Sequence, residues 1–205
     1  MNALIVVDIQ NDFIPGGALA VPRGDEVIPV AHRLMKRFGL VIATQDWHPP
    51  GHGSFASTHG REAGEIIELG GLPQVLWPDH CVRGTWGAQF APGLDLAKIQ
   101  KVIHKGTDPE IDSYSTFFDN AHRKATGLEE YLRSLGVDEI FIAGLATDYC
   151  VRFSSLDALQ CGFKVNVLID GCRGVELNPG DVEKAVVEMR SAGAKIRTSE
   201  ELINL

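Results

Sequence analysis

The 205-residue sequence has no apolar run that approaches the roughly 20 residues a membrane-spanning helix needs. It also does not begin with a basic segment followed by a cleavable apolar stretch, so we expect neither a membrane span nor a secretory signal. Basic residues are scarce, since 19 lysines and arginines stand against 27 aspartates and glutamates and give a net charge of −8. This balance argues against non-specific binding to nucleic acid, which needs a basic surface.

Cysteine is scarce as well, and no two cysteines form a Cys-x-x-Cys pair, which argues against a zinc ribbon or a thioredoxin-like redox site. The four cysteines are Cys81, Cys150, Cys161 and Cys172. Without a secretory signal, we expect reduced thiols and a cytoplasmic protein. The pattern Gly-x-Gly-x-x-Gly is also missing after the first predicted strand, where Asp-Ile-Gln-Asn stands instead. That absence speaks against a nucleotide-binding module.

The composition is otherwise that of an ordinary globular domain, with 44% hydrophobic and 22% charged residues. A chain of this size buries roughly 70% of its unfolded surface in one core, so we expect a single domain over residues 1–205. Glycine is the unusual count, at 22 residues or about 11% against a common value of about 7%. Such a content indicates many tight turns or a site lined by backbone.

Short apolar runs alternate with segments of helical spacing. The predicted strands are Ala3–Val7, Leu40–Thr44, Lys101–His104, Glu139–Ala143, Lys164–Ile169 and Ala194–Arg197. The predicted helices are Asp25–Phe38, Gly127–Leu135, Asp148–Gln160 and Gly180–Ala192. This alternation predicts a three-layer α/β/α sandwich of Rossmann-like topology, with a central, mainly parallel sheet of about six strands. Residues 46–93 have weak periodicity and are predicted to form a long loop region with a functional role.

In open α/β sheets, ligands bind at the carboxyl ends of the strands. The sequence concentrates reactive side chains at these points, in strand order: Asp8, then Asp46 and His48, then Lys105, then the segment Gly-Leu-Ala-Thr-Asp-Tyr-Cys at 144–150, and then Asp170 and Cys172. We therefore expect a cleft with ionisable groups along one edge of the sheet.

Cys150 is the candidate nucleophile because it lies in the first turn of a predicted helix that follows a strand. A helix N-terminus stabilises anions, lowers the pKa of a thiol and offers free N–H groups to an oxyanion. A thiol nucleophile also needs a proton acceptor and a group that stabilises charge, and Asp8 and Lys105 follow other strands. Taken singly, each residue has a structural alternative: a core cysteine, a turn aspartate or a surface lysine. Their joint placement at strand ends favours a catalytic role over these structural alternatives.

Asp46 and His48 have a spacing that suits a metal site, since residues i and i+2 of an extended segment face the same way. His80, in the proline-stiffened segment Trp-Pro-Asp-His-Cys, is the candidate third ligand. One aspartate and two histidines suit zinc, iron or manganese. His52 and Ser54 are additional candidates, and Asp-x-His on its own also occurs without a metal.

Four aromatic residues flank these candidates and predict an aromatic-lined pocket. They are Phe13, Trp77, Tyr114 and Tyr149.

Seven motifs carry a family resemblance that extends from about Ala3 to Thr198. They are Val-Asp-Ile-Gln-Asn-Asp-Phe (7–13), Gln-Asp-Trp-His-Pro (45–49), Trp-Pro-Asp-His-Cys-Val (77–82), His-Lys-Gly (104–106), Asp-Ser-Tyr-Ser (112–115), Gly-Leu-Ala-Thr-Asp-Tyr-Cys-Val (144–151) and Asp-Gly-Cys-Arg-Gly (170–174). On these motifs the sequence resembles the nicotinamidases, within the isochorismatase-like cysteine hydrolases.

The resemblance implies a role for each site residue. Asp8, Lys105 and Cys150 would form the catalytic triad, and the amides of Ala146 and Cys150 would form the oxyanion hole. Asp46, His48 and His80 would hold one divalent metal, with zinc expected and iron or manganese as alternatives, and Ser54 would contribute through water. A non-proline cis peptide would join Leu145 to Ala146. No organic cofactor is implied.

The implied reaction is hydrolysis of the carboxamide C–N bond of nicotinamide, and of pyrazinamide, through a thioester on Cys150. It would give nicotinate and ammonia and serve NAD salvage. The partner would be the small-molecule substrate, with no nucleic acid or membrane, and the chain would be a monomer or a homo-oligomer. Two hydrolase alternatives stay open at this point. One is a cysteine amidohydrolase of another small amide or ureide, and the other is a metal–water amidohydrolase in which Cys150 is passive.

Overall fold

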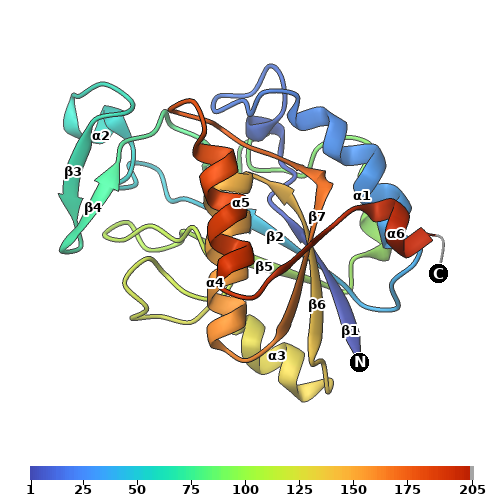
Figure 1. The fold of residues 1–205 in the computed structure, drawn as a ribbon. Helices are drawn as coiled ribbons and strands as arrows, with labels where there is room; N and C mark the ends of the chain where they lie inside the picture. The colour runs from blue at the N-terminus through green and yellow to red at the C-terminus, as the bar shows by residue number, and fades with distance from the viewer. Residues whose placement is uncertain (204–205) are drawn as a thin grey trace.

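The computed structural model describes residues 1–203, and a six-stranded sheet runs through its centre (Figure 1). Its strands are β1 (Asn2–Val7), β2 (Val41–Asp46), β5 (Lys101–Lys105), β6 (Glu139–Leu145), β7 (Lys164–Arg173) and β8 (Lys195–Arg197). They lie in the order β5-β2-β1-β6-β7-β8, and every neighbouring pair is parallel. The predicted fold class is therefore confirmed.

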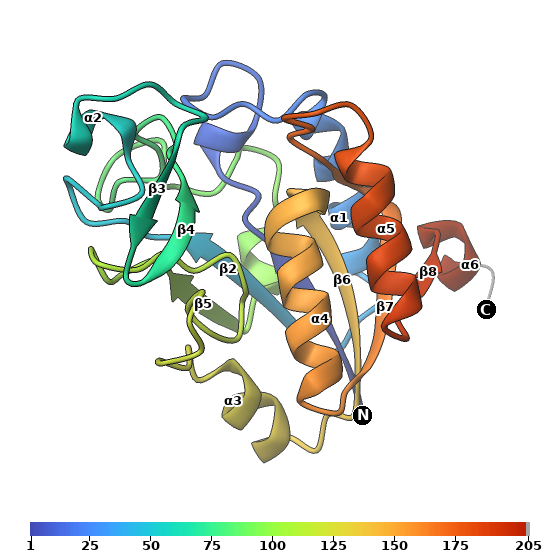
Figure 2. The same ribbon diagram turned by 60° about the vertical axis from the view of Figure 1, so that its left-hand side comes forward.

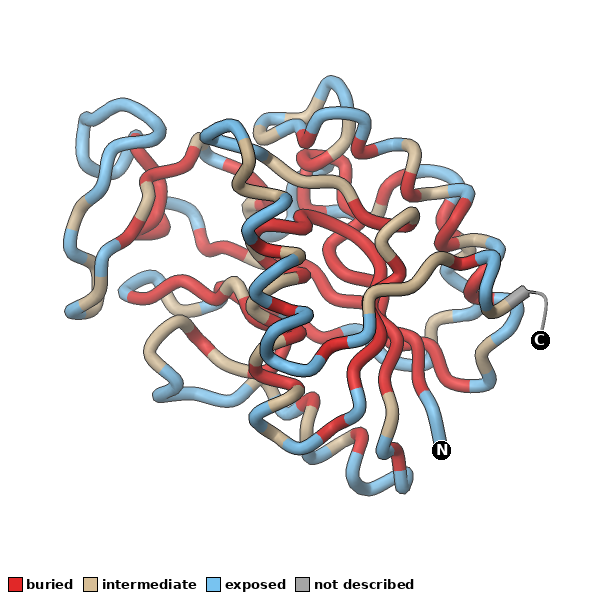
Figure 3. The backbone as a smooth tube through the Cα atoms, viewed as in Figure 1, coloured by how far each residue is buried: buried red, intermediate tan, exposed pale blue. Residues whose placement is uncertain are grey.

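Helices cover both faces of the sheet. The helices α3 (Leu128–Ser134), α4 (Arg152–Gln160) and α5 (Asp181–Ser191) lie on one face, while α1 (Val27–Met35) and α6 (Ser199–Ile203) lie on the other (Figure 2). Strand β1 explains why two layers are needed, because Ile5 contributes to the core under α3 and α4 and its neighbour Leu4 to the core under α1. Figure 3 shows the buried strands between helices whose outer faces are exposed.

The helix that carries Cys150 differs from the prediction in its first turn. Residues Thr147–Val151 form one wide, π-type turn, and α4 proper begins at Arg152. Helix α1 is likewise shorter than predicted and is preceded by a 3₁₀ turn over Gly24–Glu26. Apolar spacing marks the face that a helix buries, but it does not report the hydrogen-bond pattern of the end turns.

Strand β7 is longer than predicted because, after an irregularity in register, Cys172 pairs with Gly144. Asp170 and Cys172 therefore lie within the strand, not beyond it. Asp170 accepts hydrogen bonds from the backbone N–H and the hydroxyl of Ser199 at the start of α6. Its carboxylate thus stabilises a helix N-terminus and is not part of the predicted cleft.

The region predicted as a long loop contains regular structure of its own. It holds the short helix α2 (Ala56–His59) and an antiparallel hairpin of β3 (Ile66–Leu69) and β4 (Leu72–Val75). The hairpin turn is Gly70-Gly71, with positive φ at both residues, which is the geometry that two-residue hairpins prefer. The Gly-Gly pair was the sequence signal for this hairpin. Among the described helices, none has the length and apolar character required to span a bilayer.

Candidate active site

Three buried side chains meet where the strands end. Asp8 follows β1 directly, Lys105 is the last residue of β5, and Cys150 lies in the wide turn after β6. Lys105 Nζ is 2.9 Å from Asp8 Oδ2 and 3.2 Å from Cys150 Sγ. The structure therefore brings the three predicted catalytic residues together, with the ammonium between the carboxylate and the thiol.

Burial changes the protonation of this group. It raises the pKa of Asp8 to about 6, although the Lys105 ammonium opposes the rise. Burial alone would lower the pKa of Lys105, but Asp46 and Asp8 hold it well above its usual value, so the amine stays charged. Burial also raises the pKa of the Cys150 thiol, with Lys105 acting against it. The sequence prediction of a lowered thiol pKa was therefore wrong for this geometry, and the thiol needs a nearby base.

The backbone before Cys150 has the unusual feature that the resemblance implied. The peptide bond between Leu145 and Ala146 is cis. The Ala146 carbonyl then accepts hydrogen bonds from the N–H groups of Tyr149 and Val151, at 3.1 Å and 3.0 Å. Ala146 and Cys150 line the same small pocket.

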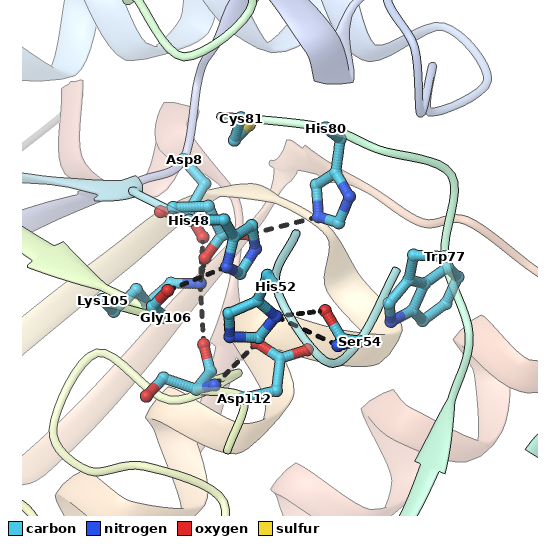
Figure 4. Close-up of polar contacts among 12 residues, drawn as sticks. Asp8, His48, His52, Ser54, Trp77, His80, Cys81, Lys105, Gly106 and Asp112 are labelled. Atoms are coloured by element: carbon cyan, nitrogen blue, oxygen red, sulfur yellow. Dashed lines mark hydrogen bonds and ion pairs between the residues drawn. The ribbon is translucent and has the colours of Figure 1, made fainter. Parts of the chain in front are cut away.

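Asp46, His48 and His80 form a second group beside the first. Figure 4 shows His48 and His80 next to Asp8 and Lys105. Asp46 ends β2, and the two histidines come from the loops that follow β2 and β4. Nε2 of each histidine lies 3.8 Å from Asp46 Oδ2. The Nδ1 atoms lie 2.9 Å from the Gly106 carbonyl for His48 and 2.7 Å from the Pro78 carbonyl for His80. Such carbonyls fix the tautomer, so that both Nε2 lone pairs face the carboxylate.

This arrangement fits a divalent metal. His48 Nε2 is buried and has no hydrogen-bond partner within residues 1–203. Burial lowers the pKa of His48 to about 4, so the imidazole is neutral and its lone pair is free at neutral pH. Burial alone would raise the pKa of Asp46, but the Lys105 ammonium lowers it, so the carboxylate is ionised. One carboxylate and two imidazoles make a donor set typical of zinc, iron or manganese.

The two additional candidate ligands lie near this group but face one another. His52 Nδ1 is 2.7 Å from Ser54 Oγ, and His52 Nε2 is 2.7 Å from the Asp108 carbonyl. Both imidazole nitrogens of His52 are thus engaged within the protein, although the ring packs on His48 with centroids 4.4 Å apart. A metal contact by either residue stays a prediction.

Asp112 is a site residue that the strand-end rule missed. Its buried carboxylate accepts hydrogen bonds from the Ser113 N–H and from Gln74 Nε2, at 2.7 Å and 3.2 Å. An oxygen of this carboxylate lies within 4.8 Å of nitrogens of His48 and His52. Asp112 lies in a loop beyond the end of β5, so only its motif, Asp-Ser-Tyr-Ser, could have drawn attention to it.

Residues of the first motif hold the candidate metal ligands in place. Gln10 Oε1 accepts a hydrogen bond from the Asp46 N–H at 2.8 Å, and Gln10 Nε2 donates to the Asp46 carbonyl at 2.9 Å. Asp12 Oδ2 accepts from the N–H of Cys81, the residue after His80, at 2.7 Å. The motif therefore contributes supports for the candidate metal ligands as well as Asp8.

The two groups meet in a pocket of about 30 Å³. Its lining contains all four predicted aromatic residues and consists of Phe13, Leu19, Asp46, Trp77, His80, Asp112, Tyr114, Ala146, Tyr149, Cys150 and Val175. The Tyr114 hydroxyl accepts hydrogen bonds from Trp77 Nε1 at 3.1 Å and from Gln74 Nε2 at 2.9 Å, which fixes two of the rings. Tyr114 and Tyr149 separate this pocket from an outer cavity of about 420 Å³, which contains none of the reactive groups. The aromatic side chains of the pocket offer faces and edges on which a planar ring can pack.

Comparison with known proteins assigns the family. A model of the isochorismatase domain matches residues 2–201. The chain belongs to the isochorismatase family. It is 55% identical to a nicotinamidase of Escherichia coli (strain K12) over 201 residues, which cover 96% of this chain and 94% of that protein. The resemblance drawn from the seven motifs is thereby confirmed.

Solved structures of the same family share the fold over nearly the whole chain. A nicotinamidase/pyrazinamidase from Acinetobacter baumanii superposes with a TM-score of 0.95 at 46% identity and covers 98% of this chain and 97% of its own. PnC1 from L. infantum, in complex with nicotinate, has a TM-score of 0.85 at 35% identity, with 98% and 93% covered. The pyrazinamidase of Pyrococcus horikoshii, in complex with zinc, has a TM-score of 0.80 at 41% identity, with 96% and 98% covered.

Proposed function

We propose that this protein is a nicotinamidase that hydrolyses nicotinamide to nicotinate and ammonia and also accepts pyrazinamide. The observation that carries the proposal is the contact of Lys105 with both Asp8 and Cys150 beside an Asp-His-His group in one aromatic pocket. The isochorismatase family and the 55% identity to a nicotinamidase support it.

In the proposed mechanism, Asp8 takes the proton from the Cys150 thiol. The sulfur attacks the carboxamide carbon, and the backbone N–H groups of Ala146 and Cys150 stabilise the negative charge on the oxygen. The C–N bond then breaks, and the proton on Asp8 leaves with ammonia. A thioester joins the acyl group to Cys150. Asp8 next takes a proton from water, and the resulting attack releases nicotinate and the free thiol.

Lys105 stabilises charge on both sides of this transfer. Its ammonium lies against Asp8 Oδ2 and Cys150 Sγ, so it favours the carboxylate before proton transfer and the thiolate after it. A raised pKa of Asp8, about 6, suits a group that must accept a proton and give it back near neutral pH.

Asp46, His48 and His80 are the residues that would hold a divalent metal, and we propose zinc. When bound, a divalent ion supplies an acceptor for a lone pair such as that of a pyridine-type ring nitrogen. Phe13, Trp77, Tyr114 and Tyr149 then orient the ring, and the pocket presents its carboxamide to Cys150. We further propose that the chain acts as one domain in the cytoplasm, within NAD salvage.

The test is an ammonia-release assay over a panel of small amides and ureides, with and without a chelator, on wild type and two variants. Cys150→Ala should abolish release and keep its metal. Cys161→Ala removes a cysteine that lies outside the pocket and should behave as wild type. Release that survives in Cys150→Ala would contradict the covalent mechanism, and a preference for ureides over nicotinamide would favour the alternative substrate class.

A further inference from the structure

Thr44 contacts the candidate catalytic base with its side chain. This fully buried residue of β2 donates a hydrogen bond from Oγ1 to Asp8 Oδ1 at 2.6 Å. The same oxygen accepts a hydrogen bond from the Asp8 backbone N–H at 3.2 Å. One hydroxyl therefore holds both the main chain and the carboxylate of Asp8.

The two carboxylate oxygens of Asp8 have different partners. Oδ1 is engaged by Thr44, whereas Oδ2 lies 2.9 Å from Lys105 Nζ, on the side of Cys150. Asp8 also has a backbone φ of +49°, a left-handed conformation that few residues other than glycine adopt. The partner of the Asp8 backbone N–H is the Thr44 hydroxyl.

We infer that Thr44 is a positioning residue, which fixes Asp8 so that Oδ2 is the oxygen that exchanges protons with the Cys150 thiol. This inference rests on the proposed function, in which Asp8 is the base. Among residues 1–203, those that line the pocket do not include Thr44. Its effect should therefore fall on the chemical step and not on substrate binding.

The experiment compares Thr44→Val with Thr44→Ser. Valine keeps the size and branching of threonine and removes the hydroxyl, whereas serine keeps the hydroxyl. For Thr44→Val we expect kcat to fall by about tenfold to a hundredfold, because a misplaced catalytic group costs this much. KM for nicotinamide should stay within about twofold, since binding is not touched. Thr44→Ser should restore most of kcat, and the metal content of both variants should match wild type.

Thr116→Val is the matched control. Thr116 is also fully buried, and its hydroxyl has no hydrogen-bond partner within residues 1–203. The substitution therefore makes the same change in a core threonine without touching Asp8, and kcat should stay at the wild-type value. If Thr44→Val does not fold, Thr44→Ala takes its place against the same serine rescue.

The outcomes separate this inference from the proposed function. A wild-type kcat in Thr44→Val, a rise in KM alone, or a Thr44→Ser variant as impaired as Thr44→Val would overturn the positioning role. Asp8→Asn is measured alongside. If Asp8→Asn is inactive while Thr44→Val is unimpaired, only the positioning role is wrong. If Asp8→Asn is fully active, the proposed mechanism is wrong and the role of Thr44 falls with it.

Discussion

The two halves of the candidate site are built differently. Asp8 follows β1, Lys105 ends β5 on the far side of β2, and Cys150 follows β6, the other neighbour of β1. The register of these parallel strands brings the three residues together. His48 and His80 lie on loops, and only Asp46 of the metal group is on a strand. The residues of the sheet-borne half, Asp8, Lys105 and Cys150, come together through the fold alone. The loop-borne half, which is the metal group, needs additional supports.

Those supports are backbone carbonyls and buried polar side chains. The carbonyls of Gly106 and Pro78 orient the two imidazoles, while Gln10 and Asp12 hold the backbone next to Asp46 and His80. Because the two halves are held in place separately, a mutation in the sheet-borne half should stop the chemistry and leave the metal in place. A mutation in the loop-borne half should first release the metal.

The largest effect is expected for the nucleophile. Cys150→Ala should lower the rate of ammonia release by roughly 10⁴-fold or more, as for nucleophiles of other covalent hydrolases. Metal content, measured by elemental analysis, should stay at the wild-type level because Cys150 is outside the Asp-His-His group. Loss of metal along with activity would show that the two halves are not separable.

His80→Ala should have the opposite signature. Removing one imidazole takes away a predicted ligand, and we expect metal affinity to fall by more than about 100-fold with a matching loss of activity. The control is His104→Ala, since His104 is exposed and stacks on Trp47 with ring centroids 4.6 Å apart. Competition with a coloured chelator measures both affinities. An unchanged affinity in His80→Ala would remove His80 from the metal group.

Gly106→Ala tests the support of His48 by Gly106 without replacing a ligand. A Cβ at Gly106 would collide with His48 Cε1, and the backbone φ there is +63°. We expect His48 to shift and metal affinity to fall by about 10- to 100-fold. Gly136→Ala has nearly the same φ, +68°, but open space around the new atom. It should lose stability by about 1 kcal/mol from strain and keep its metal. Equal metal affinity in the two variants would contradict the crowding argument.

The pH dependence should separate the halves without any mutation. Asp8 has a raised pKa of about 6 and works as a base only when it is deprotonated. The rate kcat/KM should therefore be on a plateau above this pKa and fall by about tenfold per pH unit below it. Metal content measured at each pH shows how much of the fall in kcat/KM comes from loss of metal. A flat profile between pH 7 and 5 would exclude Asp8 as the base.

The smallest effect is expected in the pocket wall. Tyr114→Phe keeps the ring but leaves Trp77 Nε1 without its hydrogen-bond acceptor. Looser ring positions should raise KM for nicotinamide by roughly threefold, with kcat nearly unchanged. A fall in kcat with constant KM would instead place the Tyr114 hydroxyl in the chemical step.

The same comparison explains what the sequence could predict. Buried β-branched runs ending in Asp8, Asp46 and Lys105 predicted both the strands and their meeting, because parallel strands present their carboxyl ends at one edge. His80 has no such geometric reason to be near Asp46. Its predicted place depended on the proline-rich motif and the family resemblance, and the loop supports that hold it were not foreseen.

Other features depended on tertiary context that no local pattern carries. The thiol pKa of Cys150 was misjudged because burial outweighs the effect of a helix N-terminus. Thr44 was read only as part of a strand, since its hydroxyl meets Asp8 across 36 residues of sequence. The extension of β7 past Asp170 depends on a register change against β6, which alternation of apolar residues does not encode.

The covalent role of Cys150 is the central claim, and acid quenching during a single turnover tests it most directly. Enzyme in excess over nicotinamide is quenched at times shorter than one turnover, and the peptide that contains Cys150 is analysed by mass spectrometry. The account predicts a nicotinoyl thioester on Cys150 that forms as ammonia is released and decays as nicotinate accumulates. Ammonia and nicotinate released together, with Cys150 unmodified at every quench time and an acyl group on no other residue, would contradict it.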